Sequence, residues 1–316
     1  MEYAKFIISL GVMILGANIV ISGAVELAKR FRVSPLLIGL IVIGFGTSFP
    51  ELTTSFLSMY DGQTDLAVGN VVGSNIANIL LVLGVAAVLR PISIQQTSFK
   101  RDALFLGISA IVLLVSLAQP QIDWQLGSLM CMTLFFYVYH AYKTDKKSLQ
   151  NKVMAVQYVA LSKRFYISTP MACLVMGCGL VLTLVGAKVL LQSVLNIFTH
   201  WGFSEVVIGL TIVALGTSLP ELVTSIIASL RKESDVALGN VMGSNIYNAL
   251  FILGITSIFK PVSVPGSDWF AVDVCVMLLA TALLLGLGLW KKKLTRRMGV
   301  GFLVTYLVYL IYLGVR

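Results

Sequence analysis

Two glutamates lie inside segments that are otherwise almost entirely apolar. Glu51 ends the motif GTSFPE and Glu221 ends the motif GTSLPE, with apolar sequence on both sides of each motif. A carboxylate in apolar surroundings needs a compensating partner. Lys188 is the one candidate for an ion pair, since nearly all other Lys and Arg residues fall in loops. An ion pair or a protonated packing contact is therefore the structural alternative, and we favour a bound cation.

Neutral oxygen atoms accompany both glutamates. Hydroxyl groups stand three or four residues before each one, and the next apolar segments carry a Ser and an Asn at i,i+4, which places them on one helix face. These residues are Thr47, Ser48, Thr217, Ser218, Ser74, Asn78, Ser244 and Asn248. Ca²⁺ takes about six to eight oxygen ligands, whereas zinc and copper prefer His or Cys. The set therefore predicts a site for a hard cation.

Each glutamate follows a proline that should break its helix. Pro50 and Pro220 have no N–H, so the carbonyl groups of Gly46 and Gly216 lose their helical partners. Within a membrane, such breaks persist only where protein, water or an ion satisfies the freed groups. In the later motifs GNVVGSN and GNVMGSN the glycines are four residues apart, a spacing common where helices pack closely. Two roles are open to Asn70 and Asn240 in these motifs: they add to the polar residues that include Asn78 and Asn248, or they hydrogen-bond a broken helix.

The composition is that of a membrane protein. Of 316 residues, 58% are hydrophobic and only 12% are charged, against about 25% in soluble domains. The net charge of +9 comes from short basic clusters between long apolar runs, which argues against nucleic-acid binding. A spanning helix needs about 20 residues, and we predict an all-α polytopic protein with ten transmembrane helices. They cover residues 4–26, 34–58, 65–89, 103–118, 124–142, 168–198, 204–229, 235–258, 269–290 and 299–315.

The chain is an internal duplication. Residues 47–78 align without a gap on residues 217–248, and 17 of these 32 positions are identical. We predict a first five-helix repeat over 1–142, a cytoplasmic linker loop over 143–167, and a second five-helix repeat over 168–316. Because five spans is an odd number, the repeats should be inverted relative to each other, an architecture typical of secondary transporters.

Basic residues predict the orientation. Nineteen of the 23 Lys and Arg residues lie in the connections after spans 1, 3, 5, 7 and 9. The side of the membrane richer in Lys and Arg is the cytoplasmic one. We therefore expect both termini outside, the central loop inside, and a location in the cell (inner or plasma) membrane.

The paired motifs GTS-x-PE and GN-x-x-GSN-I-x-N resemble the α-repeats of the cation/calcium exchanger superfamily, most closely those of prokaryotic sodium/calcium exchangers. The resemblance implies one central site that binds Ca²⁺ and Na⁺ in alternation, with Glu51 and Glu221 as shared carboxylate ligands. It assigns the hydroxyl and amide residues named above to the cations, and adds backbone carbonyls at Gly44 and Ala214. It also implies that spans 1 and 6 slide or rock against the remaining bundle.

The expected function is thus Na⁺/Ca²⁺ antiport by alternating access, without a cofactor. The expected partners are Ca²⁺, Na⁺ and the lipid bilayer, with no nucleic acid and no protein partner evident. Some relatives have Asp at the position of Asn248. The neutral Asn leaves a site charge of −2, which argues against K⁺ co-transport. The resemblance implies electrogenic exchange of three Na⁺ for one Ca²⁺.

Three other functions compete with this one. A proton/calcium exchanger shares the duplicated acidic motif, and the hydroxyl groups favour Na⁺ over H⁺ only weakly. An intramembrane enzyme would need a nucleophile and base or an acidic metal cluster, and no DDxxD, HExxH or Ser/His arrangement occurs. A passive channel is disfavoured because two fixed carboxylates make a binding site rather than an open pore.

Overall fold

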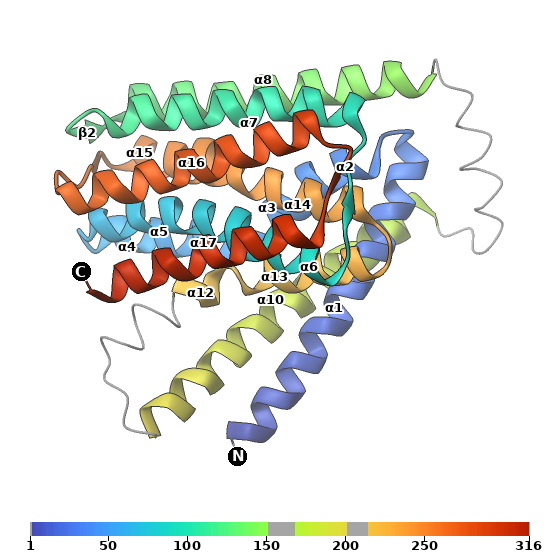
Figure 1. Ribbon diagram of the computed structural model, residues 1–316, viewed down its shortest axis with the longest axis horizontal. Coiled ribbons are helices and arrows are strands. Elements are labelled where there is room, and N and C mark those ends of the chain that lie inside the picture. The colour runs from blue at the N-terminus through green and yellow to red at the C-terminus, as the bar shows by residue number, and fades with distance from the viewer. Residues whose placement is uncertain (1, 151–167, 201–213, 316) are drawn as a thin grey trace.

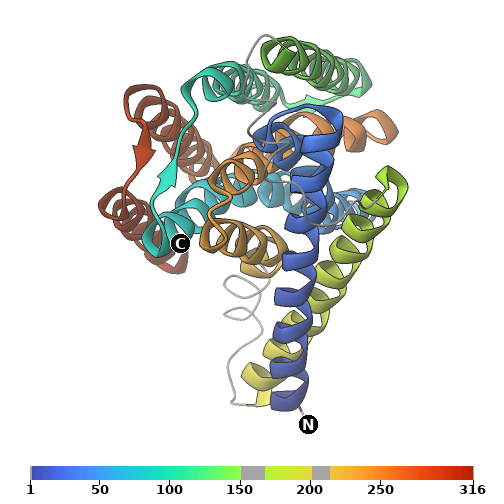
Figure 2. The ribbon, with the colours of Figure 1, turned by 90° about the vertical axis from the view of Figure 1, so that its right-hand side faces the viewer.

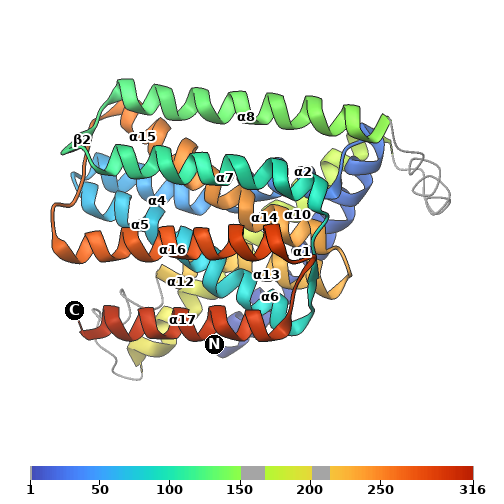
Figure 3. The same cartoon turned by 45° about the horizontal axis from the view of Figure 1, so that its top comes forward.

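The computed structural model describes residues 2–150, 168–200 and 214–315. Within these ranges the chain is mainly helical, and most of its long helices lie side by side (Figure 1). The helices α7 (Gln96–Leu117), α8 (Trp124–Gln150), α16 (Asp268–Trp290) and α17 (Arg296–Val315) run roughly lengthwise through the bundle (Figure 3).

Two further long helices leave this bundle at a steep angle. They are α1 (Glu2–Phe31) and α10 (Thr169–His200), which pack against each other and extend away from the other helices (Figure 2). They correspond to predicted spans 1 and 6. The protein is therefore built from a helix bundle and a crossed helix pair that rests on one of its sides.

Several helices are long and apolar enough to cross a membrane. By length and composition, six described stretches qualify, or seven when the bent pair Pro35–Thr47 and Phe49–Tyr60 counts as one span. The six are Glu2–Phe31, Thr64–Leu89, Thr169–His200, Ser234–Phe259, Phe270–Trp290 and Arg296–Val315. Predicted span 204–229 is described only from residue 214, and predicted linker residues 151–167 lie outside the described ranges. Helix α8 itself continues past its predicted end at 142 to Gln150.

The helices nearest the two glutamates repeat with the offset of 170 residues found in the sequence. Helices α4 (Phe49–Tyr60) and α13 (Leu219–Leu230) have matching bounds, as do α5 (Thr64–Ala77) and α14 (Ser234–Tyr247). Each of the latter continues through a π-helical segment, η2 (Asn78–Leu83) or η4 (Asn248–Ile252), into α6 (Gly84–Leu89) or α15 (Leu253–Phe259). Both π-segments begin at an asparagine of the predicted cation site.

Two short antiparallel sheets tie the halves of the chain together. Strand β1 (Ile92–Ser93) pairs with β4 (Lys293–Leu294), and β2 (Gln121–Ile122) pairs with β3 (Val262–Ser263). Each sheet therefore joins a connection from the first half of the chain to one from the second half. The two pairings follow the same pattern with the halves exchanged.

Glycines allow the central helices to approach closely. Helix α14 packs on the segment formed by α2 (Pro35–Ile38), η1 (Gly39–Ile43) and α3 (Gly44–Thr47). A Cβ atom added at Gly239 would lie 2.3 Å from the Leu36 carbonyl oxygen, and one at Gly243 would lie 2.3 Å from the Leu40 carbonyl oxygen. Both contacts are with main-chain atoms, so only a shift of the helices would relieve them.

Replacing Gly243 with Ala should therefore destabilise the protein. We expect Gly243→Ala to cost about 1–3 kcal/mol, the usual range for overpacking a core, and to lower the thermal unfolding midpoint in detergent. Gly11→Ala is the control, because Gly11 is exposed on α1 and an added Cβ meets no described atom within 4 Å. Equal midpoints for the two variants would contradict the close contact.

Candidate functional site

Both glutamates lie in the first turn of a helix that follows a break. Helix α3 ends at Thr47, Ser48 takes φ −79° and ψ 10°, and α4 begins at Phe49. In the second half, α12 (Ala214–Thr217) is followed by Ser218 with φ −86° and ψ 7°, and then by α13. The predicted helix breaks are confirmed. Each carboxylate therefore lies near a helix N-terminus, where the helix dipole favours negative charge.

The two carboxylates are fully buried and each contacts the opposite half of the chain. Glu51 and Glu221 both have 0% of their surface exposed. The Ser48 hydroxyl donates to Glu221 Oε1 at 3.0 Å, and the Ser218 hydroxyl donates to Glu51 Oε1 at 3.4 Å. The broken helices are thus brought together so that the serine of one faces the glutamate of the other.

The helix after each glutamate adds further oxygen atoms. On α14, the Ser244 hydroxyl lies 3.4 Å from Glu221 Oε1 and 3.3 Å from the Gly44 carbonyl oxygen. Gly44 is buried and starts α3, whereas Ala214 is the first residue of α12. Ser74 on α5 is buried, with 3% of its surface exposed. Carboxylate, hydroxyl and carbonyl oxygens from both halves therefore occupy one region.

Several buried polar atoms of the predicted site residues have no hydrogen-bond partner among the described residues. They are Oε2 of Glu51 and Glu221, both amide atoms of Asn78 and Asn248, and Oγ1 of Thr217. Buried polar groups in proteins are usually satisfied. Carboxylate, hydroxyl and amide oxygens are the ligand types that hard cations such as Ca²⁺ prefer.

No described basic residue neutralises the carboxylates. The ion pairs of the described residues involve neither Glu51 nor Glu221. Lys188 is exposed on α10 rather than buried beside them. The ion-pair alternative for the two glutamates is therefore wrong for the described part of the chain.

Two asparagines hold the main chain at the glutamates. The Asn70 amide donates to the Glu51 carbonyl oxygen at 3.1 Å and to Ser55 Oγ at 2.9 Å. In the repeat, the Asn240 amide donates to the Glu221 carbonyl oxygen at 3.3 Å and to Ser225 Oγ at 2.9 Å. Of the two roles open to these asparagines in the sequence, the structure shows that they bond the broken helices.

The same framework explains the position of Thr47. Its hydroxyl lies within hydrogen-bond distance of two acceptors, Asn240 Oδ1 at 3.1 Å and the Ile43 carbonyl oxygen at 3.0 Å. Asn240 thereby connects the broken helix of the first half to Glu221 in the second.

The sequence analysis did not identify Ser55 and Ser225 as part of this framework. The available signal was their identity in the repeat, four residues after each glutamate.

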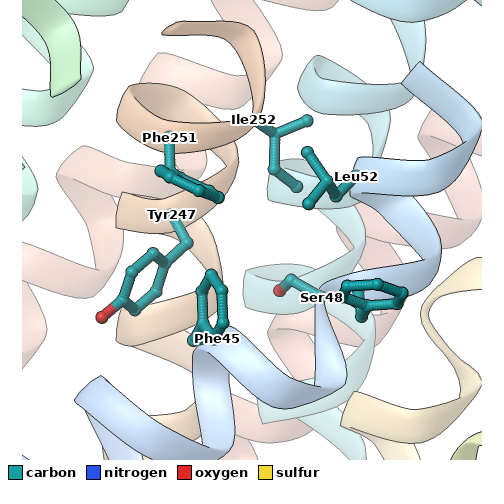
Figure 4. A pocket seen from close by; sticks show the side chains of 7 residues that line it. Phe45, Ser48, Leu52, Tyr247, Phe251 and Ile252 are labelled. Carbon is teal, nitrogen blue, oxygen red and sulfur yellow. The ribbon is translucent and has the colours of Figure 1, made fainter. Parts of the chain in front are cut away.

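Aromatic and aliphatic side chains line a pocket beside Ser48, and Figure 4 shows how they lie. The Phe45 ring lies 5.3 Å from the Tyr247 ring and 5.5 Å from the Phe251 ring. The Tyr247 hydroxyl donates to the Ile41 carbonyl oxygen at 3.2 Å, within the π-segment η1. These contacts fasten the first broken helix to α14 next to the carboxylates.

Comparison with known proteins gives a family match over both halves of the chain. The family described as "Sodium/calcium exchanger protein" matches residues 2–143 and 171–315. The putative antiporter CaxA of Alkalimonas amylolytica is 35% identical over 292 residues, which cover 92% of this chain and 90% of CaxA. The sodium/calcium exchanger MaX1 of Methanosarcina acetivorans is 30% identical over 348 aligned residues, covering 99% of this chain and 98% of MaX1.

A solved structure has the same fold. The sodium-calcium exchanger NCX_Mj, soaked with zero Na⁺ and Ca²⁺, superimposes with a TM-score of 0.84 and 28% sequence identity. The match covers 99% of this chain and 98% of that one. The likeness thus extends over the bundle and the crossed helix pair together.

Both glutamates should be indispensable for cation binding. We expect Glu51→Gln and Glu221→Gln each to abolish Ca²⁺ binding measured by isothermal titration calorimetry, because each change removes one of two buried negative charges. Glu233→Gln, in the turn before α14, is the matched control and should bind Ca²⁺ like the parent chain. Binding in either site variant comparable to that of the control would refute a shared site.

Proposed function

The chain belongs to the sodium/calcium exchanger protein family, and on that premise we propose that it exchanges Na⁺ for Ca²⁺ across a membrane by alternating access. The family consists of transporters rather than enzymes. One observation carries the proposal: two fully buried carboxylates, without a basic partner in the described residues, are each bonded to a serine of the opposite half. MaX1 and NCX_Mj, both named sodium/calcium exchangers, support it.

We assign the transported cations to one central site. Its ligands are two carboxylates, hydroxyl and amide groups, and two backbone carbonyls, which both halves of the chain provide in matching positions. The set comprises Glu51, Glu221, Asn78, Asn248, Thr47, Ser48, Thr217, Ser218, Ser74, Ser244, Gly44 and Ala214. Burial and unsatisfied oxygen atoms support this assignment. Ca²⁺ and Na⁺ are substrates here, and the transport cycle requires no resident cofactor.

We further propose the ten-span arrangement of two inverted five-helix repeats, 1–142 and 168–316, joined by the linker 143–167. The short sheets support it. In a ten-span chain, β1 follows span 3 and β4 follows span 9, so their pairing joins two connections on the same side. Strands β2 and β3 follow spans 4 and 8, and they pair on the other side.

The ion that is exchanged for Ca²⁺ is inferred from the types of ligand at the site. We infer Na⁺ because hydroxyl and carbonyl oxygens accompany each carboxylate, and these are ligands for a metal cation rather than a proton. Proton/calcium exchange is the alternative, since two buried carboxylates can carry protons, and the name of CaxA specifies an antiporter without its ions.

Site charge sets the expected electrical behaviour. Two carboxylates give −2, so one Ca²⁺ leaves the site near neutral and three Na⁺ leave it at about +1. Moving one charge across the membrane is worth about 2.3 kcal/mol per 100 mV. We therefore propose electrogenic exchange. We also propose independence from K⁺, because Asn248 adds no third negative charge.

Uptake of ⁴⁵Ca²⁺ into proteoliposomes tests the function. We expect uptake with an outward Na⁺ gradient, none with a proton gradient alone, and no loss when choline replaces K⁺ on both sides. An inside-positive potential, set with valinomycin in a separate K⁺ assay, should accelerate uptake because net positive charge leaves the vesicle. Uptake driven by protons would support the alternative, and a need for K⁺ would refute the interpretation of Asn248. Insensitivity to the potential would indicate two Na⁺ per Ca²⁺.

We also propose that the chain resides in the cell (inner or plasma) membrane, with both termini outside and the central loop in the cytoplasm. The excess of Lys and Arg after odd-numbered spans supports this orientation. The apolar helices support insertion into a bilayer.

Single cysteines should report the orientation. On a background without the four native cysteines, Thr144→Cys at the end of α8 should react with an impermeant thiol reagent only from the cytoplasmic side. Gln119→Cys, in the connection that leads to β2, should react only from outside. Both positions are exposed. The reverse pattern would overturn the orientation, and labelling of both positions from one side would overturn the span count between them.

A further inference from the structure

The crossed helices α1 and α10 form a pair that is symmetric in itself. An added Cβ at Gly16 would lie 2.6 Å from the Thr183 nitrogen, and one at Gly186 would lie 2.9 Å from the Met13 nitrogen. Gly186 is the repeat partner of Gly16, and Thr183 is the repeat partner of Met13. Each helix therefore presents the same positions to the other, and exchanging the halves leaves this crossing unchanged.

The turns that follow α4 and α13 also match. Asp61 has φ −74° and ψ 0°, and its repeat partner Arg231 has φ −76° and ψ 1°. The next residue is left-handed in both turns, with φ 77° at Gly62 and φ 70° at Lys232. Asp61 and Arg231 therefore occupy equivalent backbone positions at the ends of the two helices that carry the glutamates.

The symmetric pair nevertheless rests asymmetrically on the bundle. Arg231 Nη1 donates to the Asn18 carbonyl oxygen at 2.7 Å and to Ser22 Oγ at 2.8 Å, both on α1, and α1 packs along α13. The equivalent contact would join Asp61 to Lys188 and Gln192 on α10. In the described part of the chain no hydrogen bond or ion pair joins them, and α10 has no comparable packing on α4.

The residue types at the unused contact are complementary. Arg231 donates to a main-chain carbonyl and to a serine hydroxyl on α1, whereas Asp61 is an acceptor whose counterparts on α10, Lys188 and Gln192, carry side-chain donors. Asp61, Lys188 and Gln192 are all exposed and available for pairing. A snorkelling lysine and an isolated turn aspartate would not require this match.

We propose that Arg231 and Asp61 are alternating latches. Arg231 holds α1 in the conformation seen here, and Asp61 binds Lys188 and Gln192 of α10 when the α1–α10 pair moves to its symmetry-related position on the bundle. The inference rests on the proposed alternating-access function, in which inverted repeats exchange their conformations. It identifies which side chains stabilise each of the two states.

Cysteine cross-linking tests the second latch directly. On the cysteine-free background, we expect Asp61→Cys with Lys188→Cys to form a disulfide under an oxidant, to an extent that changes between Na⁺ and Ca²⁺ buffers. Asp61→Cys with Val189→Cys is the matched control, because Val189 is also exposed and points about 100° away around the helix. Failure of the first pair in every buffer, or equal yields for the two pairs, would refute the latch.

A charge exchange provides a second test in exchange assays. Asp61→Lys and Lys188→Asp alone should each slow exchange about two- to fivefold, the range that an exposed ion pair can supply. The double variant should recover the parent rate, while additive losses would refute the pairing. A parent chain without any exchange would instead refute the proposed function, and the cross-linking result would still decide whether the α1–α10 pair moves.

Discussion

Two buried carboxylates without basic partners are the constraint on which the rest of the architecture depends. Glu51 and Glu221 are fully enclosed, and no described Lys or Arg forms an ion pair with them. Burying an unpaired charge is costly, so the surrounding protein is arranged to limit that cost. Each carboxylate lies in the first turn of its helix, serines from the opposite half donate to the two carboxylates, and asparagines hold the main chain that bears them.

The sequence predicted those parts of the site that depend on local chemistry. Pro50 and Pro220 remove main-chain donors, and the helices break at Ser48 and Ser218 as expected. The identity of the repeats predicted that both halves contribute equivalent residues. The long apolar segments predicted a helical membrane protein. Of the ten predicted spans, six or seven are matched by described helices that are long and apolar enough to cross a membrane.

Contacts between distant segments could not be predicted in the same way. The pairing of β1 with β4, the reach of Asn240 to Thr47 and the bond from Arg231 to α1 join residues about 200 positions apart. Neither composition nor hydrophobic periodicity encodes such neighbours. For the asparagines, the repeat contained a usable signal in Ser55 and Ser225, but it becomes interpretable only when the two helices are known to be adjacent.

Departures from the repeat are as informative as its identities. The serines bonded to the carboxylates, Ser48 and Ser218, are the same in both halves, as the proposed shared cation site leads us to expect. The framework differs: Tyr247 fastens η1 where the first half has Ala77, and Arg231 contacts α1 where the first half has Asp61. In the proposed alternating access, two identical halves would give two states of equal energy, related by symmetry. The unequal contacts of Tyr247 and Arg231 would give the two states different energies, while the residues around the carboxylates stay the same.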